Sequence, residues 1–268
     1  LTDGSHTFEV RAVDNASNTD ASPASYTWVV DASAPDTTIT ANPSNPSNTA
    51  SPIFSFTGND SGGSGIALFE CQIDGGGFAA CTSGSTFGPL ADGSHTFEVR
   101  AIDNAGNTDA SPASFTWTVD IASPDTSITA NPTDPSNSAS ASFSFTGSDS
   151  GSGVASFECR LDGGGFSACT SPQNYAGLSE GSHTFEVRAV DNVGNTDATP
   201  ASYTWTVDTI APDTTITANP SDPSSVASPT FSFTGSDPGG SGIASFECQT
   251  DGGGFTACTP GSTFGPLA

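Results

Sequence analysis

Apolar and polar residues alternate in short runs along the whole chain. Phe97, Val99 and Ala101 fall on one face of such a run, while Glu98 and Arg100 fall on the other. A period of two residues is typical of a β-strand with one buried face. Because no stretch follows the 3.6-residue period of a helix, the pattern predicts an all-β protein.

Clusters of Gly, Pro, Asn and Ser separate the apolar runs, as turns between short strands require. The predicted strands of one complete repeat are residues 37–41, 52–57, 68–74, 78–82, 85–90, 95–103 and 113–120, of which 85–90 has the weakest pattern. Strands of this length with frequent turns favour two antiparallel sheets packed as a sandwich. We expect Phe54, Phe56 and Trp117 to belong to its core.

The chain repeats itself. The sequence that starts at Leu1 returns in closely similar form at Leu90 and at Leu178, which defines a repeat of about 89 residues. The sequence therefore predicts tandem immunoglobulin-like antiparallel β-sandwiches joined end to end. Their predicted bounds are 1–31 for the C-terminal part of a module, 32–120 and 121–208 for two complete modules, and 209–268 for the N-terminal part of another.

The two partial modules at the ends of the chain are complementary. Residues 1–31 match the last two strands of a module, and residues 209–268 match its first part. Either the chain is a segment of a longer polypeptide, or separate chains associate head to tail so that one completes the sandwich of the next. We favour the first interpretation. In both, the expected partners are neighbouring modules or copies of the chain itself.

The cysteines occur as one pair in each repeat, always ten residues apart: Cys71 with Cys81, Cys159 with Cys169, and Cys248 with Cys258. The repeats lack the four closely spaced ligands of a typical zinc site. We therefore expect three disulfides and an oxidising, extracellular environment. A turn over residues 74–77 that pairs Ile73 with Ala79 would bring Cys71 directly opposite Cys81.

The net charge is −25, and the only basic side chains are four arginines. This field repels nucleic acid and anionic membranes, and it attracts cations. No apolar stretch approaches the ~18 residues that a membrane-spanning helix needs. Nucleic acid and a membrane span are therefore excluded from the expected partners.

Acidic and amide side chains gather at positions that the sandwich topology brings to the joints between modules. Such oxygen ligands suit Ca²⁺, which takes six to eight of them in flexible geometry. No cofactor is required by this interpretation, and Asp and Asn are also common turn residues. Asp74 and Asp92 of the preceding module would add to a joint. The candidate calcium residues are Asp31, Asp36, Asp60, Asp103, Asn104, Asn107 and Asp109 at one joint, and Asp120, Asp125, Asp149, Asp191, Asn192, Asn195 and Asp197 at the next.

Two segments resemble the bacterial Ig-like repeats of very long surface proteins. They are Phe69-Glu-Cys-Gln-Ile-Asp-Gly-Gly and Leu90-Ala-Asp-Gly-Ser-His-Thr-Phe-Glu-Val-Arg-Ala-Ile-Asp-Asn-Ala-Gly-Asn107. Unlike antibody domains, this chain places its tryptophan on the last strand and both cysteines in one hairpin. The resemblance implies spacers, stalks and adhesin shafts at the cell surface.

The sequence argues against an enzyme. His6, His95 and His183 are the only histidines, one in each repeat, and no flanking sequence forms a nucleophile motif. We expect a structural repeat region of an extracellular bacterial surface protein or filament. The alternatives are an array that binds a glycan or a surface, and spacer modules of a large secreted hydrolase.

Overall fold

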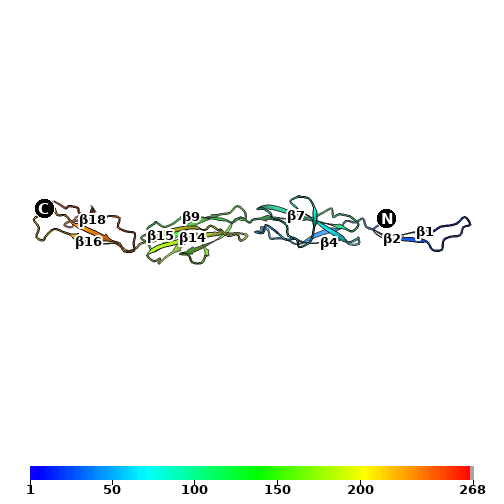
Figure 1. The fold of residues 1–268 in the computed structure, drawn as a ribbon, viewed down its shortest axis with the longest axis horizontal. Helices are drawn as coiled ribbons and strands as arrows, with labels where there is room; N and C mark the ends of the chain where they lie inside the picture. Colours follow the sequence, from blue (N-terminus) through cyan, green and yellow to red (C-terminus); the bar gives the residue numbers. More distant parts are fainter. Residues whose placement is uncertain (266–268) are drawn as a thin grey trace. The chain divides into compact units, whose positions relative to one another are not determined.

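The computed structural model describes residues 1–265, which contain strands and turns but no helix (Figure 1). The chain forms two compact units. The first comprises residues 1–122, 149–153 and 192–195, and the second comprises the other described residues. The all-β fold class is confirmed, and the division into four modules stays a prediction.

The first unit contains eight strands. They are β1 (Gly4–Val10), β2 (Ala24–Val30), β3 (Asp36–Ala41), β4 (Ser55–Asn59), β5 (Ile66–Ile73), β6 (Ala79–Cys81), β7 (Gly93–Asp103) and β8 (Ala113–Val119). Strands β3 and β4 form one sheet, and β6-β5-β7-β8 form another, while β1 pairs with β2 alone. All of these pairings are antiparallel, as an immunoglobulin-like sandwich requires.

Aromatic side chains fill the space between the two sheets of residues 36–119. Phe54 stacks on Phe97 of β7 with ring centroids 4.0 Å apart, and it contacts Trp117 of β8 edge-on at 5.2 Å. All three side chains are buried, together with Phe56 and Val99. The alternation read from the sequence therefore assigned the inner face of these strands correctly.

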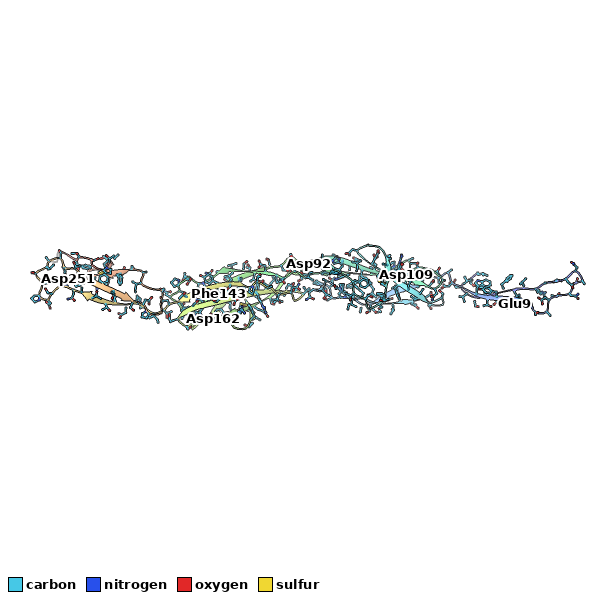
Figure 2. The ribbon with its side chains drawn as sticks, viewed as in Figure 1. Glu9, Asp92, Asp109, Phe143, Asp162 and Asp251 are labelled. Atoms are coloured by element: carbon cyan, nitrogen blue, oxygen red, sulfur yellow. A yellow bond between two sulfur atoms is a disulfide. The ribbon has the colours of Figure 1, made fainter. Side chains whose placement is uncertain are left out.

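The second unit contains β9 (Asp125–Ala130), β10 (Ala141–Ser148), β11 (Val154–Leu161), β12 (Ser167–Cys169), β13 (Gln173–Tyr175), β14 (Gly181–Asp191), β15 (Ala201–Val207), β16 (Asp213–Ala218), β17 (Ser232–Ser236), β18 (Phe246–Cys248) and β19 (Thr256–Cys258). Its sheets are β13-β10-β9 and β12-β11-β14-β15, with β16 paired to β17 and β18 paired to β19. Phe143 lies inside the core of this unit, stacked on Phe185 with centroids 4.1 Å apart (Figure 2).

The weak strand predicted at residues 85–90 does not form in the first unit. Only an isolated bridge joins Thr86 to Ile53, whereas the second unit forms the short strand β13 at the corresponding place. Gly84 and Gly88 have φ values of 85° and 130°, which lie outside the region that a regular strand uses. These two glycines therefore interrupt the ladder, although the N–H groups of Gly84, Phe87 and Leu90 still donate to the carbonyls of Phe54, Pro52 and Ala50.

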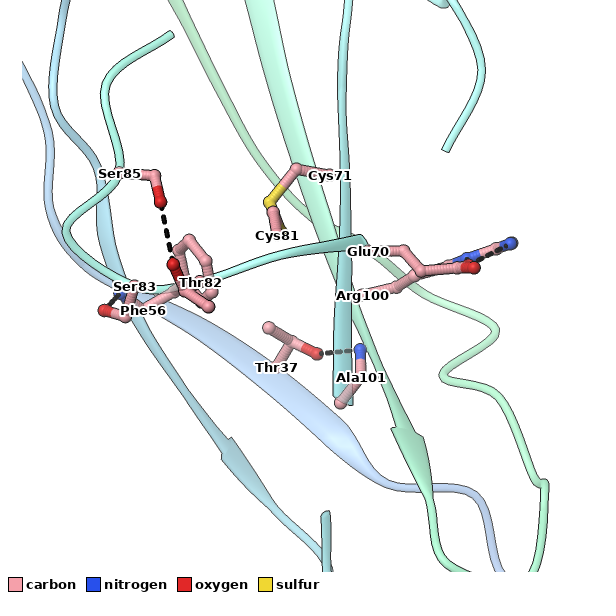
Figure 3. The surroundings of a disulfide bond; sticks show 10 residues. All are labelled: Thr37, Phe56, Glu70, Cys71, Cys81, Thr82, Ser83, Ser85, Arg100 and Ala101. Carbon is pink, nitrogen blue, oxygen red and sulfur yellow. Dashed lines mark hydrogen bonds and ion pairs between the residues drawn. A yellow bond between two sulfur atoms is a disulfide. The ribbon is translucent and has the colours of Figure 1, made fainter. Parts of the chain in front are cut away.

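All three predicted disulfides form, with Cα atoms 5.8 Å apart in each. The expected register is wrong, however, because Cys71 pairs with Ala79 in the ladder and Cys81 with Phe69. The disulfide thus links residues that lie diagonally across the hairpin (Figure 3).

A tight turn causes this difference in register. Asp74 and Gly75 have φ values of 52° and 71°, and Gly76 N–H donates to the Ile73 carbonyl over 2.9 Å. Positive φ at both central residues is what a type I′ hairpin turn requires. The hairpin therefore closes nearer to Ile73 than the expected turn would place it.

Candidate functional site

Three carboxylates meet at the start of the first complete module. Asp31, Asp60 and Asp103 each offer one oxygen atom, and these atoms lie within 4.8 Å of one another. Asp31 follows β2, Asp60 follows β4, and Asp103 ends β7. The structure thus brings together three of the predicted calcium residues from three distant parts of the sequence.

Backbone N–H groups of the loop after β4 orient two of these carboxylates. Ser64 N–H donates to Asp31 Oδ2 and Gly65 N–H donates to Asp60 Oδ2, each over 2.6 Å. A Cβ atom on Gly63 would lie 2.2 Å from Asp60 Oδ1. Position 63 therefore has to be glycine for this carboxylate to sit against the loop.

Asp103 also organises its own loop. Its Oδ1 accepts the N–H groups of Ala105 and Asn107, and its Oδ2 accepts the Asn107 side-chain amide over 2.7 Å. Burial alone would raise the Asp103 pKa, but these hydrogen bonds outweigh it and lower the pKa. The carboxyl therefore stays ionised and stabilises the turn. Turn formation is the common role of Asp and Asn residues that the sequence offered beside calcium binding.

Other predicted ligands of this joint have different partners. Asn104 donates from Nδ2 to the Ser64 and Gly65 carbonyls, each over 2.9 Å. Asp109 accepts the Ser111 N–H over 2.8 Å. Asp36 begins β3 and is exposed. None of these three belongs to the carboxylate cluster, although Asn107 contacts it through Asp31 and Asp103.

The next set of predicted residues is divided between the two units. In the first unit, a carboxylate oxygen of Asp120 lies within 4.8 Å of one from Asp149. Also in this unit, Asn195 donates to the Asp120 carbonyl over 2.9 Å, and Asn192 donates to the Gly153 carbonyl. In the second unit, Asp125 begins β9, Asp191 ends β14, and Asp197 accepts the Thr199 N–H.

Unpaired oxygen atoms provide a test of whether a cation fits these positions. The Oδ1 atoms of Asp120 and Asp149 are buried and accept no hydrogen bond, and the Asp120 side chain is fully buried. In the second unit, the Oδ1 atoms of Asp208 and Asp237 are also buried and accept no hydrogen bond. Each of these carboxylates accepts a backbone N–H through Oδ2, but a buried oxygen atom that accepts no hydrogen bond is costly, and a hard cation would pair with it. The donor set therefore fits Ca²⁺.

A second group of carboxylates, of which the sequence interpretation named only Asp92, holds the linkers between modules. Asp3 accepts the Ala32 N–H over 2.8 Å, Asp92 accepts the Ile121 N–H over 2.6 Å, and Glu180 accepts the Thr209 N–H over 3.0 Å. The recurrence of an acidic residue at this repeat position was the signal available in the sequence. Asp92 thus binds the linker backbone.

His95 and His183 have all their ring nitrogens engaged. His95 Nδ1 contacts Asp74 Oδ2 at 2.7 Å, and Nε2 contacts the Ala91 carbonyl at 2.8 Å. Because both partners are acceptors, the doubly protonated ring donates to each of them. The hydrogen bond to Asp74 is the main cause of the raised His95 pKa. The pKa of His183 is also raised, and its main cause is the hydrogen bond to the Ser179 carbonyl.

We expect this arrangement to make stability depend on pH. A raised histidine pKa stabilises the folded state below the unfolded value of 6.5, and the contribution is lost as pH rises through the folded pKa. The thermal midpoint should therefore fall between pH 6 and pH 8. Replacing His95 and His183 with Gln should flatten this fall, whereas His6→Gln should leave it, because His6 has no carboxylate partner among the described residues. An unchanged slope in the double variant would contradict the assignment.

No protein-family model matches the sequence, and the search of curated proteins found no match. The described residues contain no helix that could span a membrane.

Several solved structures are similar to the chain. The fibronectin(III)-like modules of Clostridium thermocellum CbhA are 19% identical and cover 64% of this chain and 94% of theirs, with a TM-score of 0.38. A 1.5-MDa bacterial ice-binding adhesin is 18% identical over 77% of this chain and 75% of its own, with a TM-score of 0.40. A tetra-tandem repeat from a large adhesion protein is 19% identical over 98% and 73%, with a TM-score of 0.29. The paired sheets of the chain itself define its β-sandwich fold.

Proposed function

We propose that this chain is a structural repeat region of an extracellular surface protein or filament, in which tandem β-sandwiches act as a stalk that holds or links cells or surfaces. The observation that carries the proposal is the repeated anchoring of the linkers. Asp31 Oδ2 accepts the Ser64 N–H over 2.6 Å, and Asp208 Oδ2 accepts the Ser241 N–H over the same distance. Since Asp3 and Glu180, which directly precede β1 and β14, bind the same two linkers, each of these linkers is held on both sides.

The three disulfides and the structural contacts of the histidines support this role. Each hairpin is cross-linked, which suits an oxidising environment outside the cell. His95 and His183 are each held between a carboxylate and a backbone carbonyl, and each lies near the start of a strand, β7 or β14. A small contribution to the stability of the fold explains the presence of these two histidines without a catalytic role.

Calcium at the joints forms part of the proposal. Asp31, Asp60 and Asp103 would supply three oxygen ligands, and the bound cation would offset the repulsion between their charges. Neutralising this cluster would stabilise the linker after β2 against the loop after β4. A stiffer linker is what a load-carrying stalk needs.

Calcium titration with and without a matched substitution tests the proposal. We expect Ca²⁺ to raise the thermal midpoint, and Asp60→Asn to weaken binding by about tenfold or more in calorimetric titration. Asp36→Asn removes the same charge from an exposed position in the same module, so it should bind calcium as the parent does. Electron micrographs should show straight particles in calcium and bent ones in chelator.

Two results would contradict the proposal in different ways. If chelator changes neither the thermal midpoint nor the particles, calcium does not stiffen the joints, although an anchored stalk would remain. If the chain binds a defined glycan on an array, the alternative of a glycan-binding module array is favoured over a purely structural role.

A further inference from the structure

The loop before β14 contains a short series of contacts that connects a histidine to the following linker. His183 lies on β14 and is 7% exposed, and its Nε2 atom lies 2.9 Å from the Ser179 carbonyl oxygen. The next residue, Glu180, accepts the Thr209 N–H through Oε2 over 3.0 Å. The residue that can change its charge near neutral pH therefore contacts the residue directly before the one that holds the linker.

Glu180 holds this linker with both carboxylate oxygens. Besides the bond from the Thr209 N–H, Thr209 Oγ1 donates to Glu180 Oε1. Thr209 directly follows Asp208, whose Oδ2 accepts the Ser241 N–H over 2.6 Å. The Thr209 and Ser241 amides therefore report separately on the two contacts that hold the linker.

Ser179 depends on His183 for its position. In the part of the chain that the structure describes, the hydrogen bonds of Ser179 run to His183 Nε2, from the carbonyl oxygen at 2.9 Å and from the hydroxyl at 3.5 Å. One residue earlier, the Leu178 N–H donates to the Ala139 carbonyl over 2.9 Å. The backbone between Leu178 and β14 is therefore held by the His183 ring.

Asp162 fixes the other side of this ring. Figure 2 labels Asp162, which lies in the turn between β11 and β12. Its Oδ2 lies 2.8 Å from His183 Nδ1, and its Oδ1 accepts the Thr184 N–H over 2.8 Å. The carboxylate is thus oriented by the backbone of β14 and directs its second oxygen at the imidazole.

The other groups near the ring are uncharged at neutral pH. The Trp205 ring of β15 lies with its centroid 5.6 Å from the imidazole. Burial is the main cause of the raised pKa of Tyr175 on β13, so its hydroxyl stays neutral where a histidine titrates. The charged groups that face His183 are therefore Asp162 and, in the loop before β14, Glu180.

Protonation decides whether Nε2 can hold the Ser179 carbonyl. The Asp162 carboxylate and this carbonyl are both acceptors, so the doubly protonated ring donates to each of them. A neutral ring keeps one proton, and the charged carboxylate binds it more strongly than a carbonyl does. The proton then stays on Nδ1, and Nε2 faces the carbonyl oxygen as a second acceptor. Deprotonation therefore replaces a hydrogen bond at Ser179 with a repulsion.

The first complete module contains the same series of contacts. His95 Nε2 lies 2.8 Å from the Ala91 carbonyl oxygen, and the next residue, Asp92, accepts the Ile121 N–H over 2.6 Å. The acid is one methylene shorter than Glu180, but its position directly after the bound carbonyl is kept. The arrangement therefore belongs to the repeat and is not a feature of one loop.

We propose that His183 is a pH-sensitive anchor for the linker that follows β15: its protonated ring fixes Ser179 so that Glu180 holds Thr209, and deprotonation of the ring releases them. The bond to the Ser179 carbonyl raises the His183 pKa, so the held form extends to higher pH than it would with an ordinary histidine. The linker is held below this pKa and released as pH rises through it.

The anchor regulates the linkers of the proposed stalk, and the inference rests on that role. The two fail on different results. If Thr209 is held equally at every pH, the linkers keep their carboxylate contacts and the stalk remains. If micrographs show no extended particles, the stalk role fails, while the Thr209 contact can still follow the charge of His183.

Amide hydrogen exchange of the whole chain, followed by NMR between about pH 5 and about pH 8, tests the anchor. Dividing the intrinsic exchange rate at each pH by the observed rate gives the protection factor of each N–H. We expect protection of Thr209 to fall by about tenfold, with a midpoint equal to the His183 pKa measured from its ring signals. The Ser241 N–H, held by Asp208 without a histidine, should show no such step.

Two variants remove the ends of this series of contacts. His183→Gln removes the titrating ring, so the step at Thr209 should disappear, whatever constant protection remains. Glu180→Ala should leave the Thr209 N–H unprotected at every pH, although the His183 ring still titrates. Equal pH dependence of the Thr209 and Ser241 amides in the parent protein would overturn the proposal, as would a step at Thr209 that survives His183→Gln.

Asp162→Asn provides the decisive comparison. The new amide can accept the Thr184 N–H through its oxygen and donate to His183 Nδ1 through its nitrogen, so a neutral ring places its proton on Nε2. The ring then holds the Ser179 carbonyl in both charge states, and Thr209 should stay protected at about pH 8. Release of Thr209 at that pH, as in the parent, would overturn the proposal. Unchanged near-ultraviolet circular dichroism would show that each variant stays folded.

Discussion

Phe97→Ala is expected to destabilise the first complete module by about 3–5 kcal/mol. The Phe97 ring is fully buried and contacts Phe54, Phe56 and Phe87, so its removal leaves a cavity between two sheets that are held apart by other aromatic rings. A small domain has a total stability of about 5–15 kcal/mol, so the loss is a large part of it. Equilibrium denaturation followed by near-ultraviolet circular dichroism measures the change.

Phe8→Ala is the matched control for this prediction. Phe8 occupies the same repeat position in a nearly identical local sequence, but its side chain is 58% exposed. Measured at concentrations where the chain is monomeric, the control should change the unfolding free energy by less than about 0.5 kcal/mol. Equal losses in the two variants would mean that residues 36–119 do not bury Phe97 as described.

Removing one disulfide by the double substitution Cys71→Ala and Cys81→Ala is expected to cost about 3 kcal/mol. The cross-link closes a short loop, and it restricts the unfolded chain more than the folded hairpin, which β5 and β6 already hold. The module should therefore unfold at a lower denaturant concentration, with little change in its far-ultraviolet spectrum.

The second unit supplies the comparison for this experiment. The same substitution at Cys159 and Cys169 should cost a similar amount, because that hairpin has the same ladder and the same Cα separation of 5.8 Å. Reduction of the parent protein should lower both stabilities together. An unfolding midpoint that does not respond to either substitution would show that the sheets alone set the stability.

The carboxylates show how much of a site a repeat pattern can predict. The recurrence of acidic positions predicted a joint, and Asp31, Asp60 and Asp103 do meet there. The same pattern could not separate these three from Asp36 or Asp109, since all five are aspartates near the predicted loops. Only the backbone path of the loop after β4 decides which carboxyl groups face one another.

The histidines show a similar division. Their regular spacing indicated strand ends, and the absence of flanking motifs argued against catalysis. The contact of His95 with Asp74, a residue 21 positions earlier, depends on how the β5–β6 turn approaches β7. That contact raises the His95 pKa, and no local pattern contains it.

The sequence alone determined that the chain is all-β, that it repeats, which strand faces are buried, and which cysteines pair, because these properties depend on local periodicity and on spacing within one hairpin. The tertiary structure decided the hairpin register, the members of the carboxylate cluster, and the exposure of Phe8 against the burial of Phe97. Each of these depends on segments far apart in the chain. Phe8 and Phe97 have the same neighbours in sequence, but the sheet packed against a side chain sets its environment.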